Sequence, residues 1–238
     1  MLEIQKGLRG RQVLVVDDER FSRSIIARFL FEMGLGDVTQ AKDGAEALTK
    51  LADDGQDIAL VICDFNMPVM NGLQFLKALR TGVQRAVRRD LPVIMLTGHS
   101  DHGLVGAAMA LDVDAFLVKP VSKGNLESRL LHVVSATPEA KDIAVYNHVD
   151  VDRISDLLLR GKAPPEPELK AKPAEEAGPR GRKITLLELE PRQVLAEDLV
   201  APSGELLLAA GVALSQRMIQ RLRELPSLGI PLEHVWID

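Results

Sequence analysis

The sequence predicts an open α/β fold, in which helices cover a parallel sheet, followed by a smaller module rich in β-structure. The main observation is that five short apolar runs alternate with helical patterns before residue 136, which is typical of a parallel sheet covered by helices. The length of 238 residues also favours two units, because domains usually hold roughly 100 to 200 residues. Finally, the composition changes abruptly at 162–183, between the two predicted units.

The five apolar runs have the length of strands. Three of them are nearly continuous in Val, Ile and Leu, as expected for strands that are covered on both faces. In chain order the runs are Val13–Val16, Val38–Ala41, Ile58–Cys63, Val93–Leu96 and Ala115–Val118. The sequence therefore predicts a doubly wound, five-stranded parallel sheet.

Helical patterns separate these runs. After the first run, large apolar residues recur every three or four positions from Phe21 to Met33, and Gly34 stands where a helix C-cap is expected. Leucines at helical spacing follow the third run, and apolar residues from Leu126 to Val134 mark a helix after the fifth. Each predicted strand-to-helix step is short, as the α/β arrangement requires.

The segment 162–183 is predicted to be a linker. Its 22 residues include five prolines and ten charged residues, and Leu169 is the only large apolar side chain. Such a segment buries too little apolar surface to offset the entropy lost on ordering, and its prolines favour an extended spacer. The predicted organisation is an α/β domain over 1–136, a helical extension over 137–161, this linker, and a β-rich module over 184–238.

The C-terminal module is predicted to contain a hairpin, a helix and a final strand. Val194–Val200 and Glu205–Ala210 flank an Ala-Pro-Ser-Gly turn signal. Ser215 precedes an amphipathic pattern and is expected to cap a helix. His234–Ile237 has the pattern of a strand that closes the module.

Four of the predicted strands end in polar side chains that the apolar runs do not require. Asp17 and Asp18 follow the first strand, Asp64 the third, Thr97 the fourth and Lys119 the fifth. Ligands of open α/β sheets bind outside the carboxyl ends of the strands, so we expect these side chains to converge. Three neighbouring carboxylates repel one another and favour a hard divalent cation such as Mg²⁺. Asp64 could then accept a phosphoryl group, with the Thr97 hydroxyl and the Lys119 charge near its oxygens.

Each of these residues alone has an ordinary explanation. An Asp after a strand is commonly a helix N-cap, while a lone Thr97 would be a turn residue and a lone Lys119 a solvated lysine. Only the occurrence of all of them at successive strand ends favours a phosphoryl site. Among the other reactive or charged residues, Cys63 is interpreted as a small buried hydrophobe, and Arg85, Arg88 and Arg89 as a solvated surface.

Five motifs carry a resemblance to a known family. They are Val-Leu-Val-Val-Asp-Asp, Ala-Lys-Asp-Gly-Ala-Glu-Ala-Leu, Cys-Asp-Phe-Asn-Met-Pro-Val-Met-Asn-Gly, Val-Ile-Met-Leu-Thr-Gly and Ala-Phe-Leu-Val-Lys-Pro. With them, the segment 11–136 resembles the receiver domain of bacterial two-component response regulators, and is most similar to the chemotaxis-type receivers. The resemblance implies a flavodoxin-like (βα)5 fold with strand order 2-1-3-4-5.

The resemblance also implies a phosphorylation site and a metal site. Asp64 corresponds to the phosphoacceptor. Asp17 and Asp18 correspond to the acidic pair that holds Mg²⁺ together with Asp64, and the backbone carbonyl of Asn66 is expected to contribute.

A second group of positions corresponds to the switch of the family. Thr97 and Lys119 match the switch hydroxyl and the phosphate-contacting lysine. Phe116 matches the aromatic residue whose orientation reports phosphorylation, and is expected to turn inward when Asp64 is phosphorylated. The Lys119–Pro120 peptide matches one that is usually cis.

The function implied by this resemblance is that of a response regulator in a two-component phosphorelay. A histidine kinase or histidine phosphotransferase would phosphorylate Asp64 in an Mg²⁺-dependent reaction, and this would switch a protein-interaction surface for a downstream protein that the sequence does not identify. No enzymatic activity is expected beyond phosphorylation and dephosphorylation of the receiver itself. A phosphorylation-dependent homodimer is left open.

Composition argues against other partners. The net charge of −5 gives no basic footprint for nucleic acid, and no apolar run approaches the roughly 18 residues of a membrane span, so a cytoplasmic protein is expected. Through Leu189, Val194-Leu195-Ala196-Glu197-Asp198, Gly204, Leu206-Leu207-Leu208, Gly211 and Leu214, the tail also resembles a short β-rich element of HD-GYP-type signalling proteins, without their catalytic part. Two alternatives therefore remain, a transcriptional regulator with an atypical DNA-binding tail and an inactive relative of a cyclic-dinucleotide phosphodiesterase.

Overall fold

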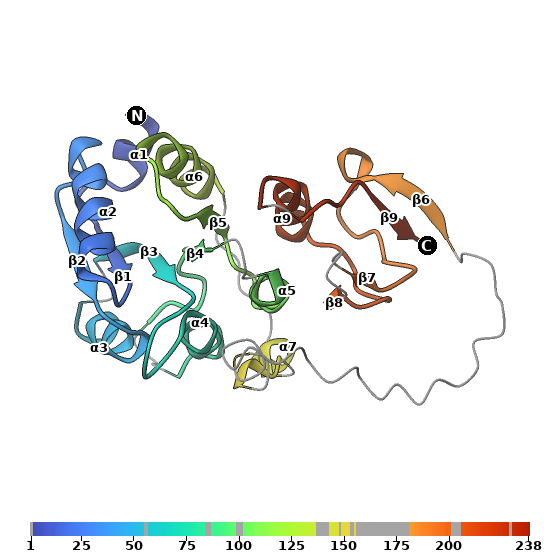
Figure 1. The fold of residues 1–238 in the computed structure, drawn as a ribbon, viewed down its shortest axis with the longest axis horizontal. Coiled ribbons are helices and arrows are strands. Elements are labelled where there is room, and N and C mark those ends of the chain that lie inside the picture. The colour runs from blue at the N-terminus through green and yellow to red at the C-terminus, as the bar shows by residue number, and fades with distance from the viewer. Residues whose placement is uncertain are drawn as a thin grey trace. The chain divides into compact units, whose positions relative to one another are not determined.

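The computed structural model describes residues 2–54, 57–83, 87–98, 102–136, 143–147, 149–152, 155, 181–200, 206–228 and 230–238. The chain divides into two compact units, which we describe separately (Figure 1). The first consists of residues 1–100 and 111–149, and the second of residues 101–110 and 150–238. Among the described residues, no helix is long and apolar enough to cross a bilayer.

The first unit is built on the five-stranded parallel sheet that the sequence predicts. Its strand order is β2-β1-β3-β4-β5, which confirms the doubly wound fold. The strands are β1 (Gln12–Val16), β2 (Val38–Ala41), β3 (Ile58–Asp64), β4 (Val93–Thr97) and β5 (Ala115–Val118). The third and fourth strands are one residue longer than the apolar runs, so Asp64 and Thr97 are themselves the last residues of their strands.

Helices cover the sheet because alternate strand residues are buried on each face. One face packs Val13, Val15 and Ile62 against apolar residues of the helices α1, α2 and α6. The residues between them, such as Leu14 and Val61, are also fully buried, and α3 and α4 pack against each other (Figure 1). The helices of this unit are α1 (Leu2–Gly7), α2 (Arg20–Glu32), α3 (Gly44–Asp54), α4 (Gly72–Thr81), α6 (Lys123–Ser135) and α7 (Ile143–Asn147).

Helix α1 was not predicted from the sequence. It has only six residues, too few for a periodic pattern, yet Ile4 and Leu8 belong to the hydrophobic core. The helix packs against α6. Gly7 allows this approach, because a Cβ atom at this position would lie 2.1 Å from Val134 Cγ1.

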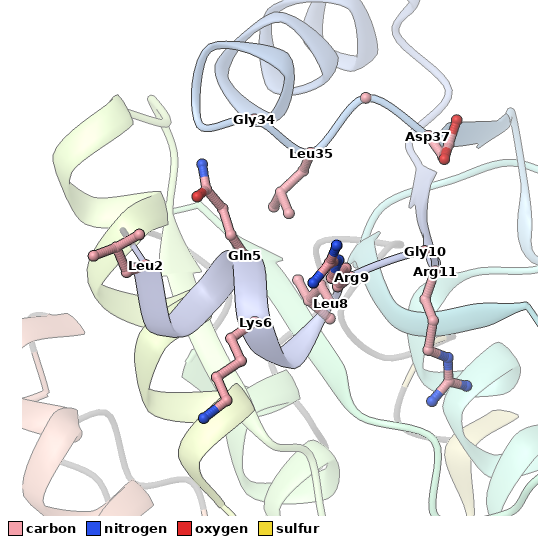
Figure 2. Close-up of a pocket in the computed structure, with 11 residues that line it drawn as sticks. Leu2, Gln5, Lys6, Leu8, Arg9, Gly10, Arg11, Gly34, Leu35 and Asp37 are labelled. Atoms are coloured by element: carbon pink, nitrogen blue, oxygen red, sulfur yellow. The ribbon is translucent and has the colours of Figure 1, made fainter.

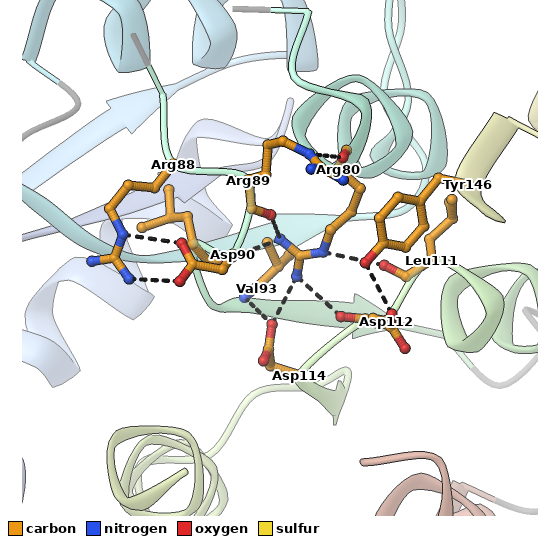
Figure 3. Close-up of polar contacts among 10 residues, drawn as sticks. Arg80, Arg88, Arg89, Asp90, Val93, Leu111, Asp112, Asp114 and Tyr146 are labelled. Carbon is orange, nitrogen blue, oxygen red and sulfur yellow. Dashed lines mark hydrogen bonds and ion pairs between the residues drawn. The ribbon is translucent and has the colours of Figure 1, made fainter. Parts of the chain in front are cut away.

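The amino edge of the sheet is held together by a buried arginine, Arg80, from the last turn of α4 (Figure 3). Its side chain is fully buried and forms an ion pair with Asp114, with 2.9 Å between Nη2 and Oδ2. The same carboxylate oxygen accepts the backbone N–H of Val93, the first residue of β4, at 2.9 Å. The Arg80 guanidinium also donates to four backbone carbonyl oxygens at 2.7–3.2 Å, those of Arg89, Leu91, Leu111 and Asp112.

Helix α7 adds a tyrosine to this network and lies within the predicted extension 137–161. It packs against α4, and the Lys77 ammonium donates to the Val149 carbonyl at 2.7 Å. Tyr146 is completely buried, and its hydroxyl donates to Asp112 Oδ2 at 3.0 Å (Figure 3).

The prediction of a solvated arginine surface is wrong for Arg89. Its Nε donates to the Arg80 carbonyl at 2.6 Å, and its guanidinium lies 5.9 Å from the centre of the Tyr146 ring. Arg88 is exposed, as predicted, and pairs with Asp90. Arg85 lies outside the described residues.

The second unit contains α5 (His102–Ala110) and the predicted β-rich module. Strand β6 (Arg182–Thr185) pairs antiparallel with β9 (His234–Ile237), and β7 (Leu199–Val200) with β8 (Leu206–Leu208), in line with the expected hairpin and final strand. Helix α9 (Gln216–Glu224) begins after Ser215, whose Oγ accepts the Met218 N–H at 3.2 Å.

The predicted end of the linker needs a correction. Strand β6 begins at Arg182, so the last two residues of the range 162–183 belong to the module. They pair with Ile237 and Trp236, and the Lys183 ammonium lies 6.0 Å from the centre of the Trp236 indole, which accounts for the earlier start. Residues 162–180 lie outside the described part of the chain.

Candidate functional site

Three carboxylates meet at the carboxyl edge of the sheet, where the sequence predicts them. Asp17 and Asp18 follow β1, Asp64 ends β3, and one oxygen from each lies within 4.8 Å of the others. Asp17 and Asp64 are buried, whereas Asp18 is exposed. We searched the described residues for groups of at least three His, Cys, Asp or Glu side chains whose ligand atoms lie close enough to hold one metal ion. Asp17, Asp18 and Asp64 form such a group.

Asp17 is fixed in place by hydrogen bonds to both of its oxygens. The Glu19 N–H donates to Oδ1 at 2.8 Å, and the Ser22 hydroxyl donates to Oδ2 at 2.7 Å. The Arg23 guanidinium donates to the backbone carbonyl of Asp18 at 3.2 Å. The start of α2 therefore positions the acidic pair, and sequence analysis missed Ser22 and Arg23 because neither stands at a strand end.

Lys119 bridges two of the carboxylates. Its ammonium lies 2.8 Å from Asp64 Oδ1 and 3.0 Å from Asp17 Oδ2. Burial opposes the charged form of this lysine, but the hydrogen bonds and charges of Asp64 and Asp17 outweigh it and raise the pKa of Lys119. Lys119 is therefore a permanent cation at physiological pH.

Asp64 remains under electrostatic strain despite this lysine. Burial, reinforced by the charge of Asp17, raises the pKa of Asp64 from 3.8 to about 6, although Lys119 acts in the opposite direction. The Lys119 ammonium thus pairs with two of the three carboxylates of this group. The donor set fits a hard divalent cation, which prefers carboxylate oxygens and keeps some of its water ligands, and the exposure of Asp18 leaves room for water.

The turn after β3 brings helix α4 close to Asp64. The Gly72 N–H donates to the Phe65 carbonyl at 3.0 Å, and a Cβ atom at Gly72 would lie 2.3 Å from the backbone oxygen of Asp64. Only glycine fits this approach. Asn71 then caps α4 by accepting the Gln74 N–H at 3.0 Å, so the loop that follows Asp64 is fixed at both ends.

Two predicted switch residues lie on the neighbouring strands. Thr97 is 3% exposed, and its hydroxyl donates to the Gly98 carbonyl at 3.1 Å. Phe116 is fully buried, with its ring stacked on Phe65 at a centroid distance of 6.4 Å. In this structure the Phe116 ring is already buried against Phe65, and its reorientation on phosphorylation of Asp64 stays a prediction.

The remaining predictions fall at the same edge. The Lys119–Pro120 peptide is cis, as expected. Asn66 is exposed two residues after Asp64, and the role of its carbonyl as a metal ligand stays a prediction. Cys63 is fully buried, and burial raises the pKa of its thiol well above the usual range, which agrees with its interpretation as an apolar core residue.

A cavity of about 510 Å³ lies at the opposite edge of the first unit, between α1 and the loop that leads into β2 (Figure 2). Its lining includes Gln5, Arg9 and Leu35. The Gln5 side chain donates to the Met33 carbonyl at 2.8 Å and so ties α1 to the end of α2. Because ligands of open α/β sheets bind at the carboxyl edge, this cavity is a weaker candidate than the Asp64 site.

Comparison with protein families decides the assignment. Residues 13–131 match the family described as the response regulator receiver domain. The chain belongs to this receiver family. The match begins at β1 and ends within α6, so α1, α7 and the C-terminal module lie outside it.

Curated relatives of the receiver are chemotaxis proteins. The chain is 36% identical over 119 residues to the chemotaxis protein CheY1 of Helicobacter pylori. The aligned segment covers 50% of this chain and 93% of that protein. It is 35% identical over 123 residues to the CheY homolog of Campylobacter jejuni, covering 52% of this chain and 92% of that protein. The receiver is therefore of the chemotaxis type.

Solved structures similar to the receiver include the chemotaxis response regulator CheY4 of Vibrio cholerae, with 34% identity, a TM-score of 0.45 and coverage of 52% of this chain and 98% of that one. A receiver domain protein from Clostridium thermocellum has 28% identity, a TM-score of 0.46 and coverage of 52% and 94%. The match of each covers about half of this chain.

Proposed function

We propose that Asp64 is the phosphoacceptor of this response regulator, and that its phosphorylation switches a protein-interaction surface. The observation that carries this proposal is the bridge from Lys119 to Asp17 and Asp64, within a group of three carboxylates. A group of three carboxylates, two of them buried, is poised to bind a cation, and its lysine is placed for phosphoryl oxygens. Because the chain belongs to the receiver family, phosphoryl transfer is the reaction that fits this arrangement.

Asp17, Asp18 and Asp64, with the Asn66 carbonyl, are the proposed ligands of Mg²⁺. The bound ion would neutralise phosphoryl oxygens and lower the charge repulsion among the carboxylates. Without it, a pKa of about 6 leaves Asp64 partly protonated at mildly acidic pH. We therefore expect Mg²⁺ binding to weaken as the pH falls below about 6.

In the proposed transfer, a carboxylate oxygen of Asp64 attacks the phosphorus of a phosphohistidine on a histidine kinase or phosphotransferase. An O–P bond forms as the N–P bond breaks, and the imidazole nitrogen leaves with the electron pair and takes up a proton from solvent. Lys119, held between Asp64 and Asp17, stabilises the charge on the transferred group. The contribution of the protein is positioning and electrostatics.

The switch would act through Thr97. Its hydroxyl now donates to the carbonyl of the next residue, Gly98, a local bond that a phosphoryl oxygen on Asp64 could replace with a charge-assisted one. Movement of Thr97 would then change the surface formed by the helix after β4, by strand β5 and by the helix after β5. The downstream protein or a second copy of the chain would bind there. This is a population shift between two conformations.

Nothing in the described residues favours the two alternative functions. The three-carboxylate group is at the receiver site, and the match to a known family is to receivers rather than to DNA-binding or phosphodiesterase families. The receiver function is therefore the one that the site supports best.

The decisive experiment is labelling of the purified chain with radioactive acetyl phosphate in the presence of Mg²⁺. We expect labelling of the wild type, loss of labelling on addition of EDTA, and background labelling for Asp64→Asn. The matched control is Asp57→Asn, which changes an exposed carboxylate beside the opposite end of β3 and should label like the wild type. Retained labelling of Asp64→Asn would overturn the assignment.

A further inference from the structure

Helix α5 is buried around its axis over residues 104–109, unlike helix α6. In α6 the buried residues are Leu126, Leu130 and Val133, which lie on one face at helical spacing. In α5 the six consecutive residues 104–109 are all buried. Successive residues of an α-helix are about 100° apart, so six in a row surround the axis more than once and no face of α5 is left to solvent.

The sequence of α5 is suited to this environment. Between His102 and Ala110 the helix contains no Asp, Glu, Lys or Arg, and its buried side chains are Leu104, Val105, Ala107, Ala108 and Met109. A helix that is apolar all round needs a cover over its entire surface, whereas a helix on one face of a sheet keeps a polar outer side. The composition therefore indicates that a second apolar surface lies against α5.

That second surface comes from the C-terminal module. Helix α5 packs against strand β8, and both belong to the second compact unit, although α5 lies within the receiver match in the sequence. Leu207 and Leu208 point to opposite faces of the strand and are 3% and 5% exposed, so β8 is apolar and buried on both faces. One helix of the receiver segment is thus packed with the module that follows it.

Helix α5 also follows the proposed switch directly. Thr97 ends β4, and only four residues separate it from His102, the first residue of α5. A displacement of Thr97 would pull on the start of α5 through this short connection. At the other end, the segment after α5 is fixed by Asp112, whose side chain accepts the Tyr146 hydroxyl.

We propose that α5 is the docking surface of the C-terminal module in the unphosphorylated chain, and that phosphorylation of Asp64 releases β8 from it. The occupant of the apolar α5 surface is thus the strand Leu206–Leu208 of the same chain. The release of β8 rests on the proposed phosphorylation of Asp64, whereas the docking of β8 on α5 does not. By linkage, if phosphorylation weakens docking, then weaker docking must favour phosphorylation by the same factor.

Hydrogen–deuterium exchange of the full chain, without phosphodonor, tests the docking. Leu208→Asp places a charge on β8 and should raise the exchange rate of residues 102–110 at least tenfold, with α6 unchanged. Leu187→Asp is the matched control, because Leu187 is an 82% exposed leucine of the same module. The exchange of β6 and β9 is measured in the same experiment, because it shows whether the module itself stays folded. If Leu208→Asp leaves the exchange of 102–110 unchanged, even when the module itself unfolds, docking on α5 is wrong.

The release is tested by adding beryllofluoride and Mg²⁺ to the wild-type chain. We expect exchange to rise together in 102–110 and 206–208, and not in Asp64→Asn. We also expect Leu208→Asp to be labelled severalfold faster by acetyl phosphate than Leu187→Asp. Normal labelling of the wild type with no change in either segment would overturn the release. Absence of labelling would instead count against the proposed function, with the docking result standing separately.

Discussion

The two edges of the receiver sheet both bury charged side chains, but they treat them in opposite ways. At the amino edge, the Arg80 guanidinium is paired with Asp114 and bonded to four backbone carbonyl oxygens. At the carboxyl edge, Lys119 pairs with Asp17 and Asp64 within a group of three carboxylates, while the Arg23 guanidinium donates to the backbone carbonyl of Asp18. One network satisfies its charge within the protein, while the other leaves negative charge unbalanced.

This difference separates a structural role from a functional one. A buried charge whose hydrogen bonds are complete fixes the loops around it, because removing any partner exposes the others to an apolar environment. A buried cluster with excess charge destabilises the fold by itself and gains stability when a cation binds. The amino edge is therefore expected to fail when it is mutated, and the carboxyl edge to become more stable.

The largest expected effect is that of Arg80→Met, which tests the amino edge. The substitution keeps much of the side-chain volume but removes the cation that pairs with Asp114 and the donor to four backbone carbonyl oxygens. Breaking a buried ion pair in this way costs about 3–5 kcal/mol, to be measured as the free energy of unfolding in urea. Arg88→Met is the control, because the Arg88–Asp90 pair is exposed and should contribute less than about 1 kcal/mol. Equal losses in the two variants would show that the Arg80 network has no special role.

The second prediction concerns the carboxyl edge and its pH dependence without Mg²⁺. Asp64 has a pKa of about 6 in the folded chain compared with 3.8 for an exposed carboxyl group. Well below the unfolded-state pKa of 3.8, both states hold the proton, so burial of Asp64 carries no ionisation cost. Between pH 4 and 6 the folded state holds more protons than the unfolded state, so stability falls as the pH rises. Above pH 6 the cost reaches its full value, about 3 kcal/mol as an upper estimate.

Asp64→Asn should therefore stabilise the metal-free chain at pH 8 by about 1–3 kcal/mol and much less at pH 4, in urea unfolding with EDTA present. Asp57→Asn serves again as the control and should show no such pH-dependent gain. Addition of Mg²⁺ should stabilise the wild type more than Asp64→Asn. A variant that is less stable than the wild type at pH 8 would contradict the view of this edge as electrostatically strained.

The sequence predicts the two edges unequally well, for a physical reason. Asp64, Thr97 and Lys119 stand at the ends of apolar runs, so a local pattern places them together once the parallel sheet is recognised. Arg80 lies in an amphipathic helix like any surface arginine, and its partners Leu111, Asp112 and Asp114 are 31–34 residues away in the sequence. Backbone carbonyl acceptors leave no trace in residue types. The same holds for Tyr146, whose partner Asp112 is 34 residues away.

The smallest expected effect is that of Tyr146→Phe, which asks whether the amino-edge network extends beyond the receiver match. The ring and its burial are kept, and only the hydrogen bond to Asp112 is lost, at a cost of about 0.5–1.5 kcal/mol for a single hydrogen bond. A double-mutant cycle with Asp112→Asn isolates this bond, because Asp112 has a φ of 52° and asparagine tolerates that conformation. A coupling energy above about 1 kcal/mol would make α7 an integral part of the receiver. Additive effects would mean that Tyr146 contributes through apolar packing alone, and that the network ends at Asp112.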